Sequence, residues 1–117
     1  MDDDVARALR TRIEELRGRG GDCGAYGSVL DNSLKSGRIS MRPVMWRHEG
    51  RLVAGEASPS GDMSLAREID SLNVGRRGVD EVVWTMEHEA VHIAFGIPSS
   101  SAEFEATVNS RVRRCRA

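Results

Sequence analysis

The chain has one lysine, few aromatic rings and no long hydrophobic run. Lys35 is the single lysine among 117 residues, the aromatic side chains number five, and hydrophobic residues make up 39%. No stretch reaches the eighteen or so consecutive apolar residues of a membrane-spanning helix, so we expect no membrane partner. The formal net charge of −1 provides no overall attraction to nucleic acid, and we expect none to bind.

The N-terminus lacks the basic start and apolar stretch of a secretory leader, because it begins Met-Asp-Asp-Asp. This pattern predicts a cytoplasmic protein by default, or a secreted one if a leader has been removed. No internal repeat or low-complexity tract is visible, and a chain of this length has room for one modest core. We therefore expect a single domain over residues 1–117 and make no prediction about its oligomeric state.

Cysteine is also scarce, with Cys23 near the start and Cys115 near the end. In an oxidising compartment the two could form a disulfide, whereas in a reducing one they would be free thiols. Both lie far in sequence from the histidines discussed next, so we do not count them as metal ligands. The arginines near the C-terminus suit the negative end of a helix dipole and need no nucleic-acid partner.

Two of the three histidines fall in the sequence His88-Glu89-Ala90-Val91-His92. Apolar residues recur at helical spacing from Val82 to Phe95, and Gly96 followed by Pro98 predicts the end of that helix. On a helix, His88 and His92 lie one turn apart on one face and can bind a single cation. Glu89 projects beside that cation, where a carboxylate can take a proton from an attacking water.

These residues resemble the signature of the zincin metallopeptidases, His-Glu-x-x-His. The resemblance implies an α+β zincin-like domain, a zinc cofactor and a third protein ligand downstream. Six residues past His92, where metzincins have a ligand, the chain has Pro98. The following segment offers Glu103 and Glu105 instead, an arrangement similar to a gluzincin, in which a glutamate of the next helix binds zinc.

Glu105 is the better third ligand of the two. The second helix has an apolar stripe of Phe104, Val108, Val112 and Cys115, and Glu105 lies close to that inward face. Glu103 falls on the wet side, three residues after Ser100, which predicts a capping box; we keep it as the reserve. Thermolysin-like gluzincins have a longer spacing and deuterolysin-type aspzincins a shorter one ending in aspartate, so the subfamily stays open.

The resemblance implies zinc-dependent hydrolysis of peptide bonds, with Glu89 as general base and a peptide or protein as substrate. Two histidines and one carboxylate also describe a non-haem iron site, but iron leaves Glu89 without a role. A regulatory or binding module with weak, latent or no peptidase activity is the alternative, and an amidohydrolase of cell-wall peptides is a third. Zincins often hold the oxyanion of the reaction with a Tyr, His or Arg, so Tyr26 and His48 are candidates.

The rest of the chain predicts a small mixed sheet below an N-terminal helix. Residues 2–17 carry an apolar stripe at helical spacing, and we expect this helix to cover one face of the sheet. The glycine-rich segment 20–28 is expected to be a loop. Residues 38–47 and 51–57 alternate as a β-hairpin with its turn at 48–50, and Pro43 indicates an edge strand or bulge.

The segment before the motif helix is the least regular. Met63 to Ala66 is predicted to be a strand, because zincins have a strand here whose exposed edge binds an extended substrate. Leu65, Ala66, Ile69 and Leu72 fall at helical spacing, so we expect a helical turn after the strand. Residues 73–78 are expected to be a turn leading into the motif helix.

Overall fold

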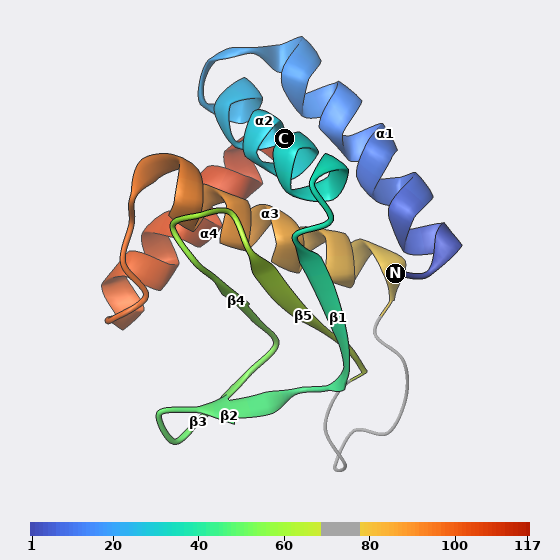
Figure 1. Ribbon diagram of the computed structural model, residues 1–117. Coiled ribbons are helices and arrows are strands. Elements are labelled where there is room, and N and C mark those ends of the chain that lie inside the picture. The colour runs from blue at the N-terminus through green and yellow to red at the C-terminus, as the bar shows by residue number, and fades with distance from the viewer. Residues whose placement is uncertain (69–77) are drawn as a thin grey trace.

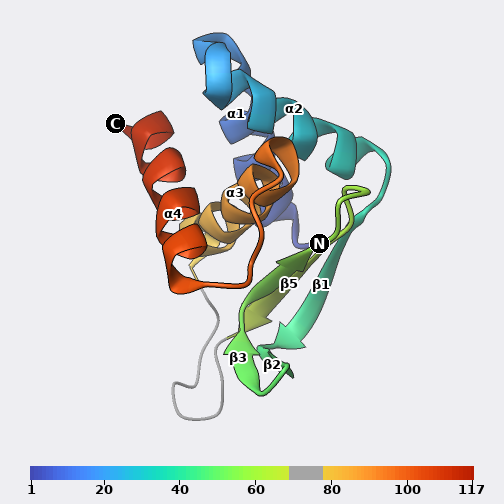
Figure 2. The same cartoon turned by 90° about the vertical axis from the view of Figure 1, so that its left-hand side faces the viewer.

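The computed structural model describes residues 1–68 and 78–117, which form an α+β fold as expected. The helices are α1 (Asp3–Arg19), α2 (Gly21–Lys35), α3 (Val79–Phe95) and α4 (Ala102–Arg116). The strands are β1 (Ile39–Val44), β2 (Trp46–His48), β3 (Arg51–Val53), β4 (Gly55–Ala57) and β5 (Met63–Glu68). In Figure 1, α1 and α2 lie above α3, and the strands lie below it with the β2–β3 hairpin farthest from the helices. Figure 2 shows α4 flanking α3.

The N-terminal helix forms as predicted, but it packs on helices rather than on the sheet. Its stripe of Val5, Leu9, Ile13 and Leu16 is at most 5% exposed. These side chains face α2 and α3. The sheet is covered by α3 instead, which contacts β4 and β5. The expectation that the first helix covers the sheet is therefore wrong, and the motif helix lies at the centre of the molecule.

The glycine-rich segment expected to be a loop is the first half of α2. Its glycines allow two helices to approach closely: a Cβ built on Gly27 would lie 2.9 Å from the Cβ of Leu16 in α1. Tyr26, Leu30 and Ser33 are buried at helical spacing along the same helix. The chain reverses between α1 and α2 at Gly20, whose φ of 67° favours glycine. Glycine here serves packing within a helix and not only turns.

The strands pair differently from the predicted long hairpin. Only β2 and β3 form an antiparallel hairpin, with Trp46 opposite Val53. The preceding strand β1 pairs in parallel with β5, and β4 pairs with β5 antiparallel. The resulting order β1-β5-β4 makes a mixed sheet, as expected, and places β1 with Pro43 at an edge. The two-residue alternation in the sequence correctly predicted that this region forms strands. It did not indicate which strand pairs with which.

The strand before the motif helix is confirmed and is longer than expected. It runs through Glu68, so Arg67 and Glu68 belong to the strand and not to a helical turn, while Ile69, Leu72 and the predicted turn at 73–77 lie outside the described residues. Since β5 is the central strand of its sheet, it has no exposed edge. The edge strand on the side of α3 is β4, whose Gly55 lies against Thr85 of the helix.

The apolar stripe of the last helix faces inward as predicted, but the exposure of Phe104 and the position of the cap differ from the prediction. Val108, Val112 and Cys115 are at most 3% exposed, but Phe104 is 39% exposed. The capping residue is Ser101, whose hydroxyl accepts a hydrogen bond from the amide of Phe104 at 3.2 Å. The cap therefore lies one residue after the predicted Ser100, and since Phe104 has no side-chain acceptor it is a simple cap and not the predicted box. Cys115 forms a disulfide with Cys23 of α2. None of the helices described is long and apolar enough to cross a bilayer.

Candidate metal centre

The motif helix presents two histidines on one buried face. Because α3 is continuous from Val79 to Phe95, His88 and His92 are separated by one turn. They are 9% and 8% exposed, and their Nε2 atoms lie 3.2 Å apart. Burial lowers the pKa of His88 below its ordinary value, and this effect outweighs the negative charge of Glu105, which would raise it. The neutral imidazole, which is the form that binds metals, is therefore favoured at His88.

Glu105 of α4 joins the two histidines, as the sequence predicted. Its Oε2 lies 2.6 Å from Nε2 of His88 and its Oε1 lies 2.9 Å from Nε2 of His92. Glu103 is exposed in the first turn of α4, and its carbonyl accepts a hydrogen bond from Thr107. Only Glu105 belongs to the group whose ligand atoms lie within 4.8 Å of one another, so the structure favours it over Glu103.

Hydrogen bonds behind the histidines orient their Nε2 atoms toward Glu105. The Nδ1 of His92 lies 2.6 Å from the carbonyl oxygen of Ile97, which can only accept, so this nitrogen donates. The Nδ1 of His88 lies 2.8 Å from Oδ1 of Asn109 and donates likewise. In the neutral rings each Nε2 then carries a lone pair. Three electron-pair donors then converge at one point, and either a proton on one of the rings or a metal ion between the three would relieve their repulsion.

The spacing of these donors suits a small metal ion. Bond lengths of about 2.0–2.1 Å to a tetrahedral zinc imply donor atoms roughly 3.3 Å apart, and the two Nε2 atoms lie at 3.2 Å. The carboxylate contacts of 2.6 and 2.9 Å are shorter, so Glu105 would withdraw by about half an ångström to admit the ion. Its side chain is 32% exposed and has room to move. His88, His92 and Glu105 could therefore hold a metal ion.

Glu89 lies next to His88, and its carboxyl group is buried without a hydrogen-bond partner in the part of the chain that the structure describes. The residue is only 7% exposed. Burial, followed by the charges of Glu105 and Glu56, raises the pKa of Glu89 to about 8. An isolated carboxyl group with a pKa near neutrality is suited to exchange protons with a reacting molecule.

The two oxyanion candidates do not join the donor group. Tyr26 is fully buried in α2, and its hydroxyl donates to Oε1 of Glu87 at 2.9 Å. Glu87 lies about 100° round the helix from His88, and Arg12 and Arg116 neutralise its carboxylate. The Tyr26 proton is therefore committed to a buried structural network, which argues against the predicted oxyanion role of Tyr26.

His48 lies in the exposed hairpin strand β2. Its Nδ1 is 3.2 Å from Oε1 of Glu56, and its side chain is 57% exposed. It contacts none of the three predicted ligands within the described chain. Because Glu56 raises the pKa of Glu89 through its charge, His48 belongs to the surroundings of the site rather than to the donor group.

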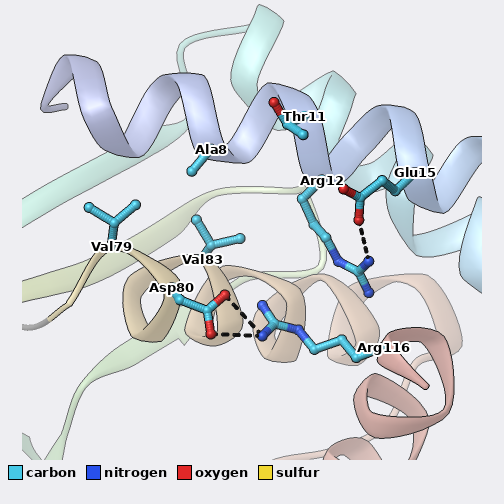
Figure 3. Close-up of a pocket in the computed structure, with 8 residues that line it drawn as sticks. All are labelled: Ala8, Thr11, Arg12, Glu15, Val79, Asp80, Val83 and Arg116. Atoms are coloured by element: carbon cyan, nitrogen blue, oxygen red, sulfur yellow. Dashed lines mark hydrogen bonds and ion pairs between the residues drawn. The ribbon is translucent and has the colours of Figure 1, made fainter.

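One hollow of the described structure adjoins the predicted ligand His92, and a larger hollow lies apart from the predicted ligands. A hollow of about 270 Å³ beside His92 is lined by the end of β4 and the segment after α3, including Ala57, Ile93 and Ile97. A larger one of about 500 Å³ lies between α1, α3 and α4. Figure 3 shows that the latter is lined by ion pairs, Arg12 with Glu15 and Arg116 with Asp80, and none of the predicted ligands lines it.

Three residues of the site were not predicted from the sequence. Asn109 stands four residues after Glu105, so a helical face shared with the predicted ligand was a signal that could have found it. Gly55 allows β4 to approach α3, because a Cβ there would lie 2.8 Å from Cγ2 of Thr85 and 3.4 Å from Oε1 of Glu89. Glu56 follows it on the same strand. No local pattern pointed to the last two, because their position depends on strand pairing.

The chain matches no protein-family model, no curated protein and no solved structure. The resemblance to zincins therefore rests on His88, Glu89 and His92 themselves, and membership of that superfamily stays a prediction.

Proposed function

We propose that the protein is a zinc-dependent hydrolase of peptide bonds, with the reduced architecture of a minimal gluzincin. The observation that carries this proposal is the convergence of His88, His92 and Glu105 beside the buried carboxylate of Glu89, which has no hydrogen-bond partner among the described residues. A structural metal site would need no such carboxylate. A catalytic zinc centre has three protein ligands, an open position and an adjacent base.

Each residue has a distinct role in this proposal. His88, His92 and Glu105 hold the ion, and Asn109 with the Ile97 carbonyl fixes the ring orientations. Zinc, when bound, supplies a Lewis acid that lowers the pKa of water and polarises the substrate carbonyl. Glu89, whose pKa is about 8 in the metal-free protein, would ionise more readily beside a bound cation.

Glu89 then acts twice in one turnover. It takes a proton from the attacking water, and it passes this proton to the leaving amine as the peptide bond breaks. Its burial removes competing hydrogen-bond partners and keeps the carboxylate basic. Zinc is preferred over iron in this proposal because the iron alternative offers Glu89 no task.

A single substitution tests this proposal against the alternative of a binding module. Glu89→Gln keeps the size of the side chain, so the variant should fold and bind zinc like the parent while hydrolysing a mixture of unlabelled peptides at a rate reduced by at least about 100-fold. Glu103→Gln is the matched control, because it removes one exposed carboxylate from the neighbouring helix and should leave the rate unchanged. A zinc-loaded parent that is as inactive as the Glu89→Gln variant would overturn the enzyme proposal and favour the binding module.

A further inference from the structure

The hollow beside His92 adjoins the donor group directly. Its volume is about 270 Å³, and His92, which supplies one of the three predicted ligands, forms part of its wall. One residue of an extended peptide spans at most about 3.6 Å. A side chain that enters this hollow therefore belongs to a residue close to the bond that the ion would polarise. The hollow lies where a specificity pocket of the proposed hydrolase would have to lie.

The lining of this hollow is mostly aliphatic and, apart from the imidazole of His92, has no titratable group. Five residues supply its carbon surface: Ala57, Pro59, Ile93, Ile97 and Pro98. Ser58 and Ser99 add hydroxyls, and no acid, lysine or arginine belongs to the lining that the structure describes. A charged side chain placed here would lose hydration without gaining a partner, whereas an apolar side chain would be removed from water. The lining therefore favours an apolar occupant.

Hydrogen bonds hold both walls of the hollow in place. On one side, the amide of Ser58 donates to the carbonyl of Asp62 at 2.9 Å and closes the turn after β4. On the other side, the amide of Ile97 donates to the carbonyl of His92 at 3.2 Å, and Nδ1 of His92 donates to the carbonyl of Ile97 at 2.6 Å. The segment that lines the hollow thus also orients a predicted ligand. A pocket that is formed before its ligand arrives loses little affinity to ordering.

The size of the hollow suits one side chain. A cavity of about 150 Å³ is large enough to hold benzene, whereas drug-sized ligands occupy pockets of about 300–1,000 Å³. The hollow beside His92, at about 270 Å³, lies between these limits. It can hold a leucine or phenylalanine side chain but not a longer stretch of peptide.

We propose that this hollow binds one bulky apolar side chain, of the size of leucine or phenylalanine, from the substrate residue beside the reacting bond. This inference rests on the proposed hydrolase function and narrows its substrates to peptides that carry such a residue. Side chains with a charge are rejected, because the lining offers them no ion-pair partner. Glycine is a poor substrate residue at this place, because it buries no side chain there.

The test compares peptides that differ in one side chain. A labelled peptide of glycine and serine is synthesised with a single leucine, phenylalanine, tryptophan, glutamate or lysine placed in turn at each position. Binding is measured by fluorescence anisotropy to zinc-loaded Glu89→Gln protein, and cleavage is measured with the zinc-loaded parent. The methyl resonances of Ile97 in the same Glu89→Gln protein report whether the peptide occupies the hollow. We expect the leucine and phenylalanine peptides to bind roughly 10- to 100-fold tighter than the unsubstituted peptide, and the charged peptides no tighter than it.

Two variants change the hollow in opposite directions. Ser99→Trp adds an indole at an exposed position of the lining and should remove the preference for leucine, because the indole fills the space. Ser100→Trp is the matched control: it places the same side chain on the next exposed residue, outside the lining, and should keep the preference. Ile97→Ala keeps the carbonyl that accepts from His92 but enlarges the hollow, so the preference should move from leucine toward tryptophan. Such a shift in size preference would not arise from a general loss of stability.

The outcomes separate this proposal from the function on which it rests. Equal cleavage and equal binding of the apolar, charged and unsubstituted peptides would overturn the role of the hollow and leave the hydrolase proposal standing. A preference for leucine in binding, without cleavage by the parent, would support the hollow and overturn hydrolysis. A preference that both Ser99→Trp and Ile97→Ala leave unchanged, Ile97 resonances that do not shift, or a failure to bind any of the peptides would overturn the role of the hollow.

Discussion

Reduction of the Cys23–Cys115 disulfide should destabilise the protein by several kcal/mol. The bridge joins α2 to α4 across a sequence separation of 92 residues. The chain-entropy relation for a loop of that length gives roughly 4.6 kcal/mol at 25 °C, since an open chain must lose this entropy on folding. A domain of this size is typically stable by about 5–15 kcal/mol, so the loss is a large fraction of the total.

The assay is urea unfolding of metal-free protein, followed by circular dichroism with and without a dithiol reductant. Because Glu105 and Asn109 lie on α4, the zinc affinity of the Cys23→Ala/Cys115→Ala variant, measured without a thiol that would itself bind zinc, should fall with the stability of that helix. Cys23→Ala/Cys115→Ala, unfolded without reductant, controls for effects of the dithiol itself. A change in the free energy of unfolding below about 1 kcal/mol would refute the reasoning, because the entropy of a loop this long would then be irrelevant.

Three further predictions concern the site. Asn109→Ala should weaken zinc binding by about 10- to 100-fold, because His88 loses the acceptor that orients its ring, and Asn109→Asp should restore it; titration against a chromophoric chelator measures both. Gly55→Ala should lower the melting temperature, since the new Cβ would meet Thr85 at 2.8 Å, and adding Thr85→Ser should recover much of the loss if that contact is the cause. Folded metal-free protein holds a proton on Glu89 up to a pH of about 8 while the unfolded chain releases it near 4.5. Its free energy of unfolding, compared with that of Glu89→Gln in urea titrations, should therefore fall as pH rises between these values, by up to about 5 kcal/mol, and parallel pH profiles would contradict this.

The parts of the site that sequence could predict are those carried by helical periodicity. The spacing of His88 and His92 and the inward face of α4 were sufficient to choose Glu105, because both depend on 3.6 residues per turn and on nothing distant. Asn109 obeys the same rule and would have been found by extending it. The displaced cap at Ser101 shows the limit of this approach, since neighbouring serines compete for one position.

The parts that sequence could not predict depend on partners far along the chain. From the sequence, Gly27 indicates a loop. In the structure it lies in a helix and allows Leu16 of α1 to pack closely against it. β1 reads as half of a hairpin, yet its hydrogen-bond partner is β5, and no local pattern distinguishes the two pairings. Tyr26 could be assigned a catalytic role only while Glu87, its buried partner, was unknown. Tertiary contacts therefore decided both the sheet and the second helix.

The central claim is that two histidines of α3 and Glu105 of α4 bind one zinc ion. Calorimetric titration of metal-free protein with zinc tests it most directly, with Glu105→Ala and Glu103→Ala as a matched pair on the same helical turn. We predict one zinc ion for the parent and the Glu103 variant at equal affinity. The Glu105 variant should bind zinc more weakly than the parent, by a factor larger than the roughly 10- to 100-fold that is typical when a residue behind the ligands is removed. Equal affinities for all three proteins, or no zinc bound by the parent, would contradict the account.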